Sequence, residues 1–145
     1  MNHSPKKGFT LIELLAVIVI MGLLATVVVV NVAPFLGRSN FEKVKSDLAQ
    51  IEKALELFRF NELRYPTTNE GLSALVKPPE SLKNPHIYPE DGYIKSIPKD
   101  PWGNPYLYLM PGTKSSSYDL FSYGADAVEG GTKQNADIGN WSFKD

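Results

Sequence analysis

Glu13 is the residue of this sequence whose position most clearly requires a chemical partner. It is the only ionisable side chain between Phe9 and Val30, in a run that is otherwise almost entirely apolar. A carboxylate inside a membrane-length apolar segment costs about 2.5–3.5 kcal/mol on insertion scales unless it is paired. The residues alone leave two explanations open. Either the carboxylate reaches the lipid headgroups, or cleavage between Gly8 and Phe9 creates an α-amino group that pairs with it from a neighbouring copy.

A second group of acidic residues lies near the C-terminus, in a stretch rich in glycine and small polar residues. The group consists of Asp126, Glu129 and Asp137. Calcium binds about six to eight oxygens, which flexible loops supply from carboxylates and backbone carbonyls. Asp126 and Asp137 have the spacing of the ends of an EF-hand loop, but Val128 and Gly130 stand where that loop needs side-chain oxygens, and no flanking helices are expected. On chemistry alone, a solvated acidic turn explains these residues better than a metal site.

The composition excludes several other kinds of chemistry. The chain has no cysteine, so neither a disulfide nor a thiolate metal site can form. Of its two histidines, His3 lies in the short basic N-terminal segment, and His86 is predicted to be a surface loop residue. Nothing pairs a nucleophile with a base, and a net charge of −1 gives no electrostatic basis for binding nucleic acid. We therefore expect neither an enzyme nor a nucleic-acid partner.

The element that must position Glu13 is an apolar helix over residues 9–30. Its length matches the roughly 20 residues that an α-helix needs to cross a bilayer, where the backbone must satisfy its own hydrogen bonds. Lys6 and Lys7 precede it, and basic flanks favour a cytoplasmic N-terminus with the rest of the chain on the other side. The run is longer than the apolar region of a signal peptide, and no Ala-x-Ala cleavage pattern follows it.

A second helical segment is predicted to follow. Pro34 and Gly37 should interrupt the apolar helix, because proline inside a helix removes a hydrogen bond and kinks the chain. Ser39 and Glu42 have the spacing of a capping box, which predicts a new helix start. An apolar stripe then recurs at steps of three and four: Phe41, Val44, Leu48, Ile51, Leu55 and Phe58. This amphipathic segment should end near Asn61, with its charged face toward water or neighbouring subunits.

The remaining chain predicts a small antiparallel sheet packed on the long helix. Residues 106–110 and 118–122 are rich in aromatic and apolar residues, as strands are, and residues 111–117 have the Pro, Gly and Ser of a hairpin loop. A short helix is predicted over residues 68–75 and a turn over residues 100–103. The fold class is therefore α+β, with a long N-terminal α-helix against a small antiparallel β-sheet.

The N-terminal motif resembles the class III signal of type IV pilins and pseudopilins. Gly8, Phe9 and Glu13 coincide there with the long apolar run. The resemblance implies that a prepilin peptidase cuts after Gly8 and methylates the new N-terminal Phe9. It also implies that Glu13 guides subunit assembly.

Motifs through the rest of the chain narrow the resemblance to major pseudopilins of type II secretion systems. They include Arg64-Tyr-Pro-Thr-Thr68, Glu70-Gly-Leu72, Gly92-Tyr-Ile94, Asp100-Pro-Trp-Gly-Asn-Pro-Tyr106, Asp119-Leu-Phe-Ser122 and Asp137-Ile-Gly-Asn-Trp141. The resemblance divides the chain into a leader peptide (1–8), a membrane-spanning assembly helix (9–34) and a periplasmic domain (35–145).

The resemblance also implies a calcium ion in the C-terminal loop. Matched by motif, Asp126 and Asp137 are the liganding aspartates, with the carbonyls of Tyr123 and Val128 as partners. The ion would tie a long loop to the sheet in a chain that has no disulfide to do so. Trp141 is predicted to pack this loop down.

The implied function is that of the major structural subunit of a pseudopilus. Such a subunit crosses the bacterial inner membrane once, with its N-terminus in the cytoplasm, and polymerises into a periplasmic filament that drives export of folded proteins across the outer membrane. The implied partners are further copies of the chain, minor pseudopilins, the prepilin peptidase, an inner-membrane assembly platform and membrane lipid. The alternative is a pilin or minor pilin of a type IV pilus used in adhesion, motility or DNA uptake. Only the motifs over residues 100–106 and 126–141 argue against it, because both classes share the N-terminus.

Overall fold

The computed structural model describes residues 7–143, without the side chains of residues 28–34. The described part of the chain contains one long helix, α1 (Leu11–Glu62), and three short strands, β1 (Leu107–Leu109), β2 (Asp119–Ser122) and β3 (Ile138–Gly139). Four 3₁₀ helices accompany them, at Leu72–Leu75, Pro85–Ile87, Lys133–Asn135 and Asn140–Phe143. The chain divides into two units, Met1–Arg38 and Ser39–Asp145, and the boundary falls inside α1.

α1 is one continuous helix of 52 residues, so the predicted interruption at Pro34 and Gly37 is wrong. Ser39 and Glu42 lie inside the helix and do not cap a new start. A proline deprives a helix of one hydrogen bond, but once a helix has nucleated, each further residue adds a bond at little cost. Helical sequence on both sides of the proline therefore carries α1 through it. The predicted end near Asn61 is confirmed, because the last helical residue is Glu62.

The core of the second unit lies against one face of α1. Five of the six residues predicted for the apolar stripe are buried: Val44, Leu48, Ile51, Leu55 and Phe58. The sixth, Phe41, is partly exposed, and its ring contacts that of Phe143 with the centroids 5.2 Å apart. Residues from the second half of the chain cover the stripe, among them Leu72, Leu75, Tyr108, Tyr118 and Leu120. Each fully buried side chain of this kind contributes about 1.5–3 kcal/mol.

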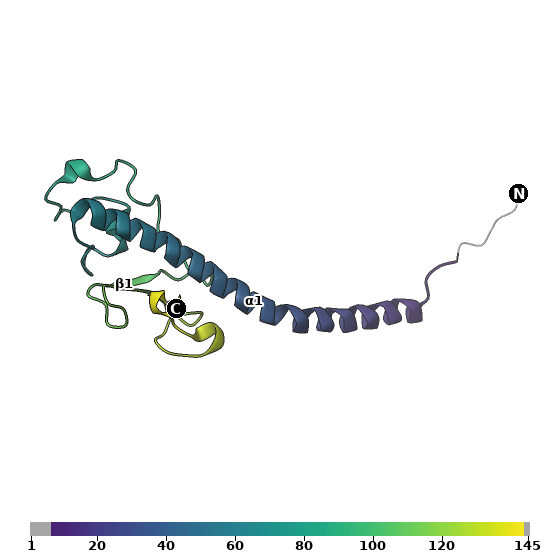
Figure 1. Ribbon diagram of the computed structural model, residues 1–145. Coiled ribbons are helices and arrows are strands. Elements are labelled where there is room, and N and C mark those ends of the chain that lie inside the picture. Colours follow the sequence, from purple (N-terminus) through teal and green to yellow (C-terminus); the bar gives the residue numbers. More distant parts are fainter. Residues whose placement is uncertain (1–6, 144–145) are drawn as a thin grey trace, which may run out of the picture. The chain divides into compact units, whose positions relative to one another are not determined.

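The three strands form one antiparallel sheet in the order β1-β2-β3, and β1 lies beside the second half of α1 (Figure 1). Leu107 pairs with Phe121 across β1 and β2, and Ser122 pairs with Ile138 across β2 and β3. The two predicted strands, their hairpin and the long-helix-on-sheet fold are confirmed. β3 was not predicted, because a strand of two residues shows no alternation of apolar and polar positions.

Two buried tyrosines of the β1 region tie the sheet to neighbouring segments. The hydroxyl of Tyr106 donates to Asp47 Oδ2 of α1 at 2.7 Å, and that of Tyr108 donates to the carbonyl of Pro66 at 2.8 Å. Burial raises the pKa of both hydroxyls well above the usual tyrosine range, so both stay protonated donors at physiological pH.

The segment predicted as a helix over residues 68–75 forms only the 3₁₀ helix Leu72–Leu75. Gly71 precedes it with φ 59° and ψ −166°. That conformation lies outside the helical region and is one that glycine adopts readily. Gly71 therefore ends the turn at residues 68–71, and the helix that follows is limited to the four residues Leu72–Leu75.

An ion pair fixes the chain where it leaves α1. Arg64 Nη1 and Nη2 donate to the two oxygens of Glu70 at 2.7 and 2.8 Å, and the Thr67 N–H donates to the same carboxylate at 2.6 Å. The hydrogen bond from Arg64 is the largest cause that lowers the pKa of Glu70 to about 2. This bidentate geometry is the strong form of an Arg–carboxylate pair.

The predicted turn over residues 100–103 is confirmed and connects to the sheet. Asp100 Oδ1 accepts hydrogen bonds from the N–H groups of Trp102 and Asn104 at 3.1 and 2.7 Å. Its other oxygen accepts the Ser122 hydroxyl at 2.6 Å, so the turn is fixed to the end of β2. The side-chain amide of Asn104 donates to the carbonyl of Gly124, two residues after β2, at 3.3 Å.

Candidate functional site

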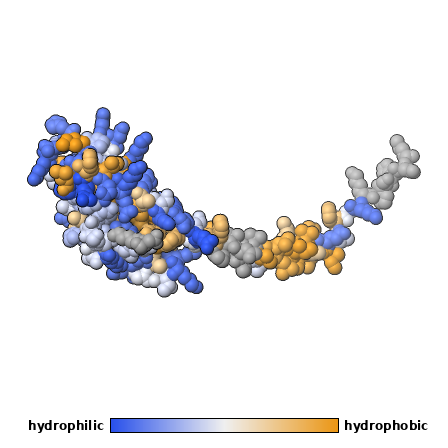
Figure 2. Space-filling view, in the orientation of Figure 1, coloured by the Kyte–Doolittle hydropathy of each residue, from blue (hydrophilic) through white to orange (hydrophobic). Residues whose placement is uncertain are grey.

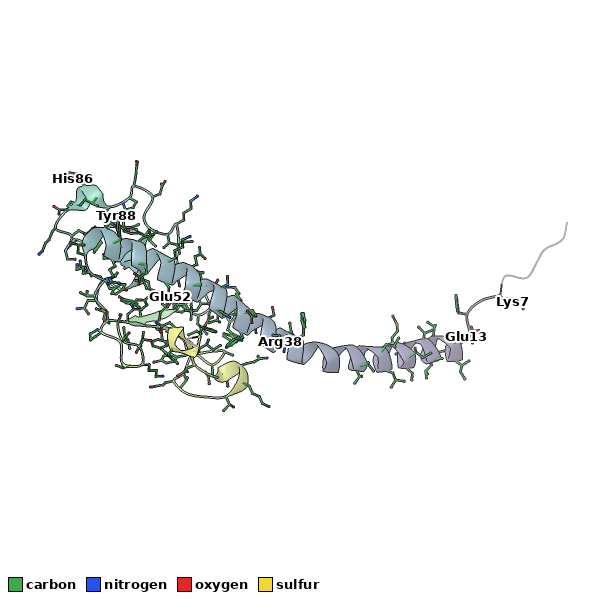
Figure 3. All side chains as sticks on the ribbon, in the orientation of Figure 1. Lys7, Glu13, Arg38, Glu52, His86 and Tyr88 are labelled. Atoms are coloured by element: carbon green, nitrogen blue, oxygen red, sulfur yellow. The ribbon has the colours of Figure 1, made fainter. Side chains whose placement is uncertain are left out.

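Glu13 lies in the first turn of α1 (Figure 3), where a reciprocal pair of hydrogen bonds with Thr10 holds it. The Thr10 N–H donates to Glu13 Oε2 at 2.9 Å, and the Glu13 N–H donates to Thr10 Oγ1 at 3.4 Å. This is a capping box, in which two backbone donors that a helix start leaves free are satisfied by side chains. The carboxylate also lies at the positive end of the helix dipole, which favours its charge.

The sequence contained the signal for this arrangement, and sequence reasoning missed it. Thr10 and Glu13 have the same Ser/Thr-x-x-Glu spacing as Ser39 and Glu42, where the capping box was expected instead. The structure supplies Glu13 with a partner inside the same chain, the Thr10 N–H. The partner predicted from the sequence, the α-amino group of Phe9 from another copy, stays a prediction.

The predicted cleavage site lies just before α1. Gly8 and Phe9 belong to the non-helical segment that precedes Leu11, and the Phe9 side chain is 90% exposed. A Cβ placed on Gly8 would meet no atom within 4 Å, so the bond to be cut lies in open surroundings. Residues 1–6 of the predicted leader lie outside the described part of the chain.

On the face visible in Figure 2, apolar side chains cover the described N-terminal part of α1. Every large apolar residue described between Leu11 and Val27 is more than half exposed: Leu11, Ile12, Leu14, Leu15, Val17, Ile18, Val19, Ile20, Met21, Leu23, Leu24 and Val27. Several are consecutive in sequence, and consecutive residues of a helix point in different directions. The described helix residues 11–27 therefore have no single buried face. Among the described residues, no helix combines the length and apolar character expected of a membrane span.

The acidic loop, residues 123–137, is held at both ends by the sheet. Because Ser122 pairs with Ile138, Tyr123 and Asp137 emerge next to each other from β2 and β3. Within the loop, both carboxylate oxygens of Asp137 accept the Gly130 N–H, at 3.1 and 3.0 Å. Strands flank this loop, so the exclusion of an EF-hand is confirmed.

Two glycines allow the acidic loop to fold back on itself. Gly124 has φ 76°, and a Cβ there would lie 2.7 Å from the carbonyl oxygen of Gln134. Gly131 has φ 87°, and a Cβ there would lie 2.4 Å from the carbonyl oxygen of Asn135. The Ala125 N–H closes the loop by donating to the Gln134 carbonyl at 2.8 Å. A side chain at either glycine would open the loop.

The donor set of the acidic loop suits a hard cation. Asp126 and Asp137 supply carboxylates, and the carbonyls of Tyr123 and Val128 are oxygen donors of the kind calcium takes. The Val128 N–H donates to Asp126 Oδ1 at 3.2 Å, which brings the residue's backbone beside that carboxylate. Among the described side chains, no three His, Cys, Asp or Glu residues gather as a metal-binding group. A cation here would therefore depend on two carboxylates, backbone carbonyls and water.

Residues 140 and 141 fix the C-terminal end of this region. The buried side chain of Asn140 accepts from the Leu120 N–H at 3.3 Å and donates to the Tyr118 carbonyl at 3.1 Å. Trp141 covers Gly139, where a Cβ would lie 2.5 Å from its ring, and it contacts Phe121 with the centroids 5.5 Å apart. The tryptophan therefore packs over β2 and β3, where the chain has returned from the acidic loop to the sheet.

His86 lies in the exposed 3₁₀ helix Pro85–Ile87, beyond the end of α1 (Figure 3). Its predicted place on the surface is confirmed. Among the described residues, three serine or threonine hydroxyls donate to a carboxylate: Ser81 to Glu70, Ser122 to Asp100 and Thr113 to Asp119. Each of these carboxylates also accepts backbone N–H groups of its own turn or loop, so these contacts support the fold.

Comparison with known proteins identifies two families in the chain. Residues 31–141 match the family described as type II secretion system (T2SS), protein G. Residues 3–29 match the prokaryotic N-terminal methylation motif. The second match covers the same segment as the capping box and the predicted cleavage site.

Similar proteins agree with this assignment. The chain is 46% identical over 141 residues to the type II secretion system core protein G of Pseudomonas aeruginosa, covering 97% of this chain and 99% of that protein. It is 46% identical over 140 residues to the core protein G of Vibrio cholerae, covering 97% and 94%. The crystal structure of the major pseudopilin from the type 2 secretion system of enterohaemorrhagic Escherichia coli matches with a TM-score of 0.67 and 42% identity, covering 78% of this chain and 96% of that chain.

Proposed function

This chain belongs to the protein G family of type II secretion systems, the major pseudopilins, and from that premise we propose that it polymerises into a periplasmic filament that drives export of folded proteins across the outer membrane. The matched proteins carry the names of secretion components, so they favour this function over a pilin of a surface pilus. The role is structural, and the proposal involves no catalysis by the chain itself.

The observation that carries the proposal is the exposed apolar surface of residues 11–27. Apolar side chains on every side of a helix need an apolar environment on every side. The sheet of the second unit covers only one face of residues 44–58 and belongs to the other unit. Before assembly, we propose that inner-membrane lipid surrounds this surface, with the N-terminus in the cytoplasm. In the filament, the same segments of neighbouring copies replace the lipid.

Removal of the leader would leave the first turn of α1 at the N-terminus of the chain, where it could contact a neighbouring copy. In our proposal a prepilin peptidase cuts after Gly8 and methylates Phe9. The new α-amino group carries a positive charge close to the capping box. The carboxylate of Glu13, which the structure holds with the Thr10 N–H, then accepts the amine of a neighbouring copy. In an apolar filament interior this charge pair has little competition from water.

We further propose that the acidic loop binds one calcium ion. The donor chemistry of Asp126, Asp137 and the carbonyls of Tyr123 and Val128 supports it, as does the way β2 and β3 bring the two loop ends together. The bound ion would supply a cross-link between the loop and the sheet. A domain of this size without cysteines gains most from such a tie, because its core is modest.

The remaining proposed partners follow from the same premise. Minor pseudopilins would share the α1 interface, and an inner-membrane platform would move subunits from lipid into the filament. The methylation motif over residues 3–29 supports recognition by the processing peptidase.

Deletion of the gene tests the function directly. We expect secreted enzymes to accumulate in the periplasm while surface pili persist. Normal secretion together with loss of twitching or DNA uptake would instead identify the chain as a surface pilin.

Replacement of Glu13 tests the assembly step. Glu13→Ala removes the carboxylate from an apolar interface, so we expect the yield of filaments to fall by about tenfold or more, the equivalent of about 1.4 kcal/mol per contact. Circular dichroism of the second unit should not change. The matched control is Glu42→Ala, which removes an exposed glutamate of the same helix. Normal filaments in Glu13→Ala would contradict the proposed charge pair.

A further inference from the structure

The C-terminal end of α1 and the residue that follows it carry apolar side chains that the second unit leaves uncovered. Phe60 and Leu63 are 81% and 89% exposed, and Leu57 is about half exposed. Together with Lys53, Glu56 and Arg59 they line an open groove of about 640 Å³, which we call the 57–63 groove. Single exposed apolar residues are ordinary, but a contiguous group with a polar rim is typical of a surface that contacts a partner.

The rim of the 57–63 groove carries an excess of positive charge. Lys53 and Arg59 line it directly, and a second groove that shares Lys53 and Leu57 extends the surface to Lys95. The acidic residue on the rim, Glu56, forms an ion pair with Arg59 at 3.4 Å. The surface therefore suits a partner with an apolar residue flanked by negative charge.

The acidic loop of the same chain has these properties. Val128 at its tip is 61% exposed, with Asp126 two positions before it and Glu129 immediately after it. The other large exposed apolar residues described in the second unit outside the groove are Phe41, Ile87 and Leu109. Val128 differs from these three in having acidic residues on both sides within two positions. If calcium occupies Asp126 and Asp137, Glu129 still supplies a negative charge at the tip.

The C-terminal end of α1, which carries the groove, and the acidic loop lie on opposite sides of the second unit (Figure 1). Gly124, at the start of the acidic loop, accepts a hydrogen bond from Asn104. Pro105, the next residue after Asn104, pairs with Lys99, whose carbonyl accepts a hydrogen bond from Lys43 of α1 at 3.1 Å. These contacts place the start of the loop near Lys43. At 1.5 Å per residue, Lys43 and Phe60 are about 25 Å apart along the helix. The loop of one copy is therefore too far along α1 to cover its own groove, so a contact between loop and groove would have to join two copies.

Two different surfaces that fit each other make a head-to-tail contact. Repetition of such a contact gives an open filament, unless the rotation between copies closes a ring. We propose that the Val128 tip of one copy docks in the 57–63 groove of the next copy, with Val128 against Phe60 and Leu63 and Glu129 beside Lys53. The proposal rests on the proposed function, because it names a contact between subunits of the same filament.

The contact is small, and its size determines under which conditions it can form. A single loop tip buries less than the roughly 1,200 Å² of a stable protein interface. It would be weak between free subunits and effective only where α1 already holds the copies side by side, because tethering raises the effective concentration. The contact would then set the order of the folded units along the filament.

Disulfide cross-linking tests this contact, and the natural chain has no cysteine to interfere. The full-length double variant Phe60→Cys/Val128→Cys is assembled in the bacterium and then oxidised. We expect a ladder of covalent multimers on a non-reducing gel, because each copy can link to a copy on either side. Each single variant should give no ladder, since one cysteine per copy allows at most dimers.

The matched control pairs Phe60→Cys with Leu109→Cys, another exposed apolar residue of the second unit. A ladder from this control but not from the Val128 pair would overturn the proposed docking. Filaments that form normally without any ladder from the Phe60/Val128 pair would also overturn it and leave the proposed function intact. Failure of the unsubstituted chain to form filaments would instead contradict the proposed function.

A charge exchange keeps the proposal testable if the cysteine variants do not assemble. Lys53→Glu and Glu129→Lys each place like charges together, and each should lower filament yield by about threefold to tenfold. The double variant Lys53→Glu/Glu129→Lys should restore the yield. Glu129→Lys combined with Lys77→Glu, an exposed lysine outside the groove, should not restore it. A double exchange no better than either single variant would refute the contact.

Discussion

The two ends of α1 use similar apolar residues but place them differently. Between Leu11 and Val27 they occur at consecutive positions, and all the large ones are more than half exposed. Between Val44 and Phe58 they occur at helical spacing on one face, and the sheet and the 3₁₀ helix Leu72–Leu75 bury them. In α1, residues 44–58 therefore pack against other parts of the same chain, whereas the large apolar side chains of residues 11–27 stay exposed.

This difference shows that the spacing of apolar residues along a helix decides whether the same chain or its surroundings must cover them. A single stripe can be covered by a sheet of the same chain, which leaves the opposite face for water. An apolar surface on all sides needs lipid or other copies, because one folded domain covers only one face.

The largest effect should come from two phenylalanines of α1 that are two positions apart. Phe58 is fully buried and Phe60 is 81% exposed. Phe58→Ala leaves a cavity in the core and should lower the free energy of unfolding of the second unit by about 3–5 kcal/mol. Phe60→Ala should change it by less than about 0.5 kcal/mol. Urea unfolding of a fragment that begins at Ser39 measures both, and equal losses would contradict the assigned burial.

Calcium should affect the second unit and leave the first unchanged. In the same fragment, calcium at one hundred times its dissociation constant should add about 2.7 kcal/mol to stability, because it binds only the folded loop. The variant Asp126→Asn/Asp137→Asn should melt at the same temperature with calcium and with a chelator. Differential scanning calorimetry measures the shift. Identical melting curves for the natural fragment would remove the proposed calcium site.

Acid should weaken the second unit through Glu70. Its pKa is lowered to about 2 in the folded state from a usual value of 4.5. The Arg64 ion pair therefore stabilises the fold above about pH 4.5, and this contribution disappears as the pH falls toward 2. We expect Glu70→Gln to cost about 2 kcal/mol at pH 7 and almost nothing near pH 2. Urea unfolding over this pH range would show the two curves converging. A constant difference would contradict the role of the pair.

The smallest effect should come from the capping box of the first unit. Thr10→Val removes the hydroxyl that accepts the Glu13 N–H, and the loss of a helix cap costs about 1 kcal/mol. Hydrogen exchange in detergent should therefore become about fivefold faster at the Glu13 amide. Thr10→Ser keeps the hydroxyl and should exchange like the natural chain. Equal exchange in all three would show that the threonine hydroxyl is not a significant cap.

The local elements were predictable because short-range chemistry specifies them. The stripe from Val44 to Phe58 has the period of a helix buried on one side, and it is buried as expected. The strands around Leu107–Leu109 and Asp119–Ser122 followed from aromatic and apolar residues on either side of a Pro- and Gly-containing loop. The N-terminal motif and the family it indicates were also evident in the residues.

The predictions of helix ends were wrong where helix-breaking residues lie inside a helix that forms cooperatively. Pro34 and Gly37 indicated a break, but α1 continues through both, because helical segments on each side support one another. The same reasoning placed a capping box at Ser39, inside that continuous helix, and overlooked the one at Thr10. A capping box is informative only where a helix begins, and the sequence did not locate that beginning correctly.

The N-terminal methylation motif, the apolar period of the second half of α1, the two longer strands and the family were all readable in the residues. The tertiary structure alone set the pairing of β3 with β2, because two residues such as Ile138 and Gly139 have no strand pattern and form a strand only when β2 offers its free edge. It also decided which apolar residues stay exposed. Phe58 and Phe60 are the same residue type on one helix, and their positions relative to the sheet leave one in the core and the other exposed.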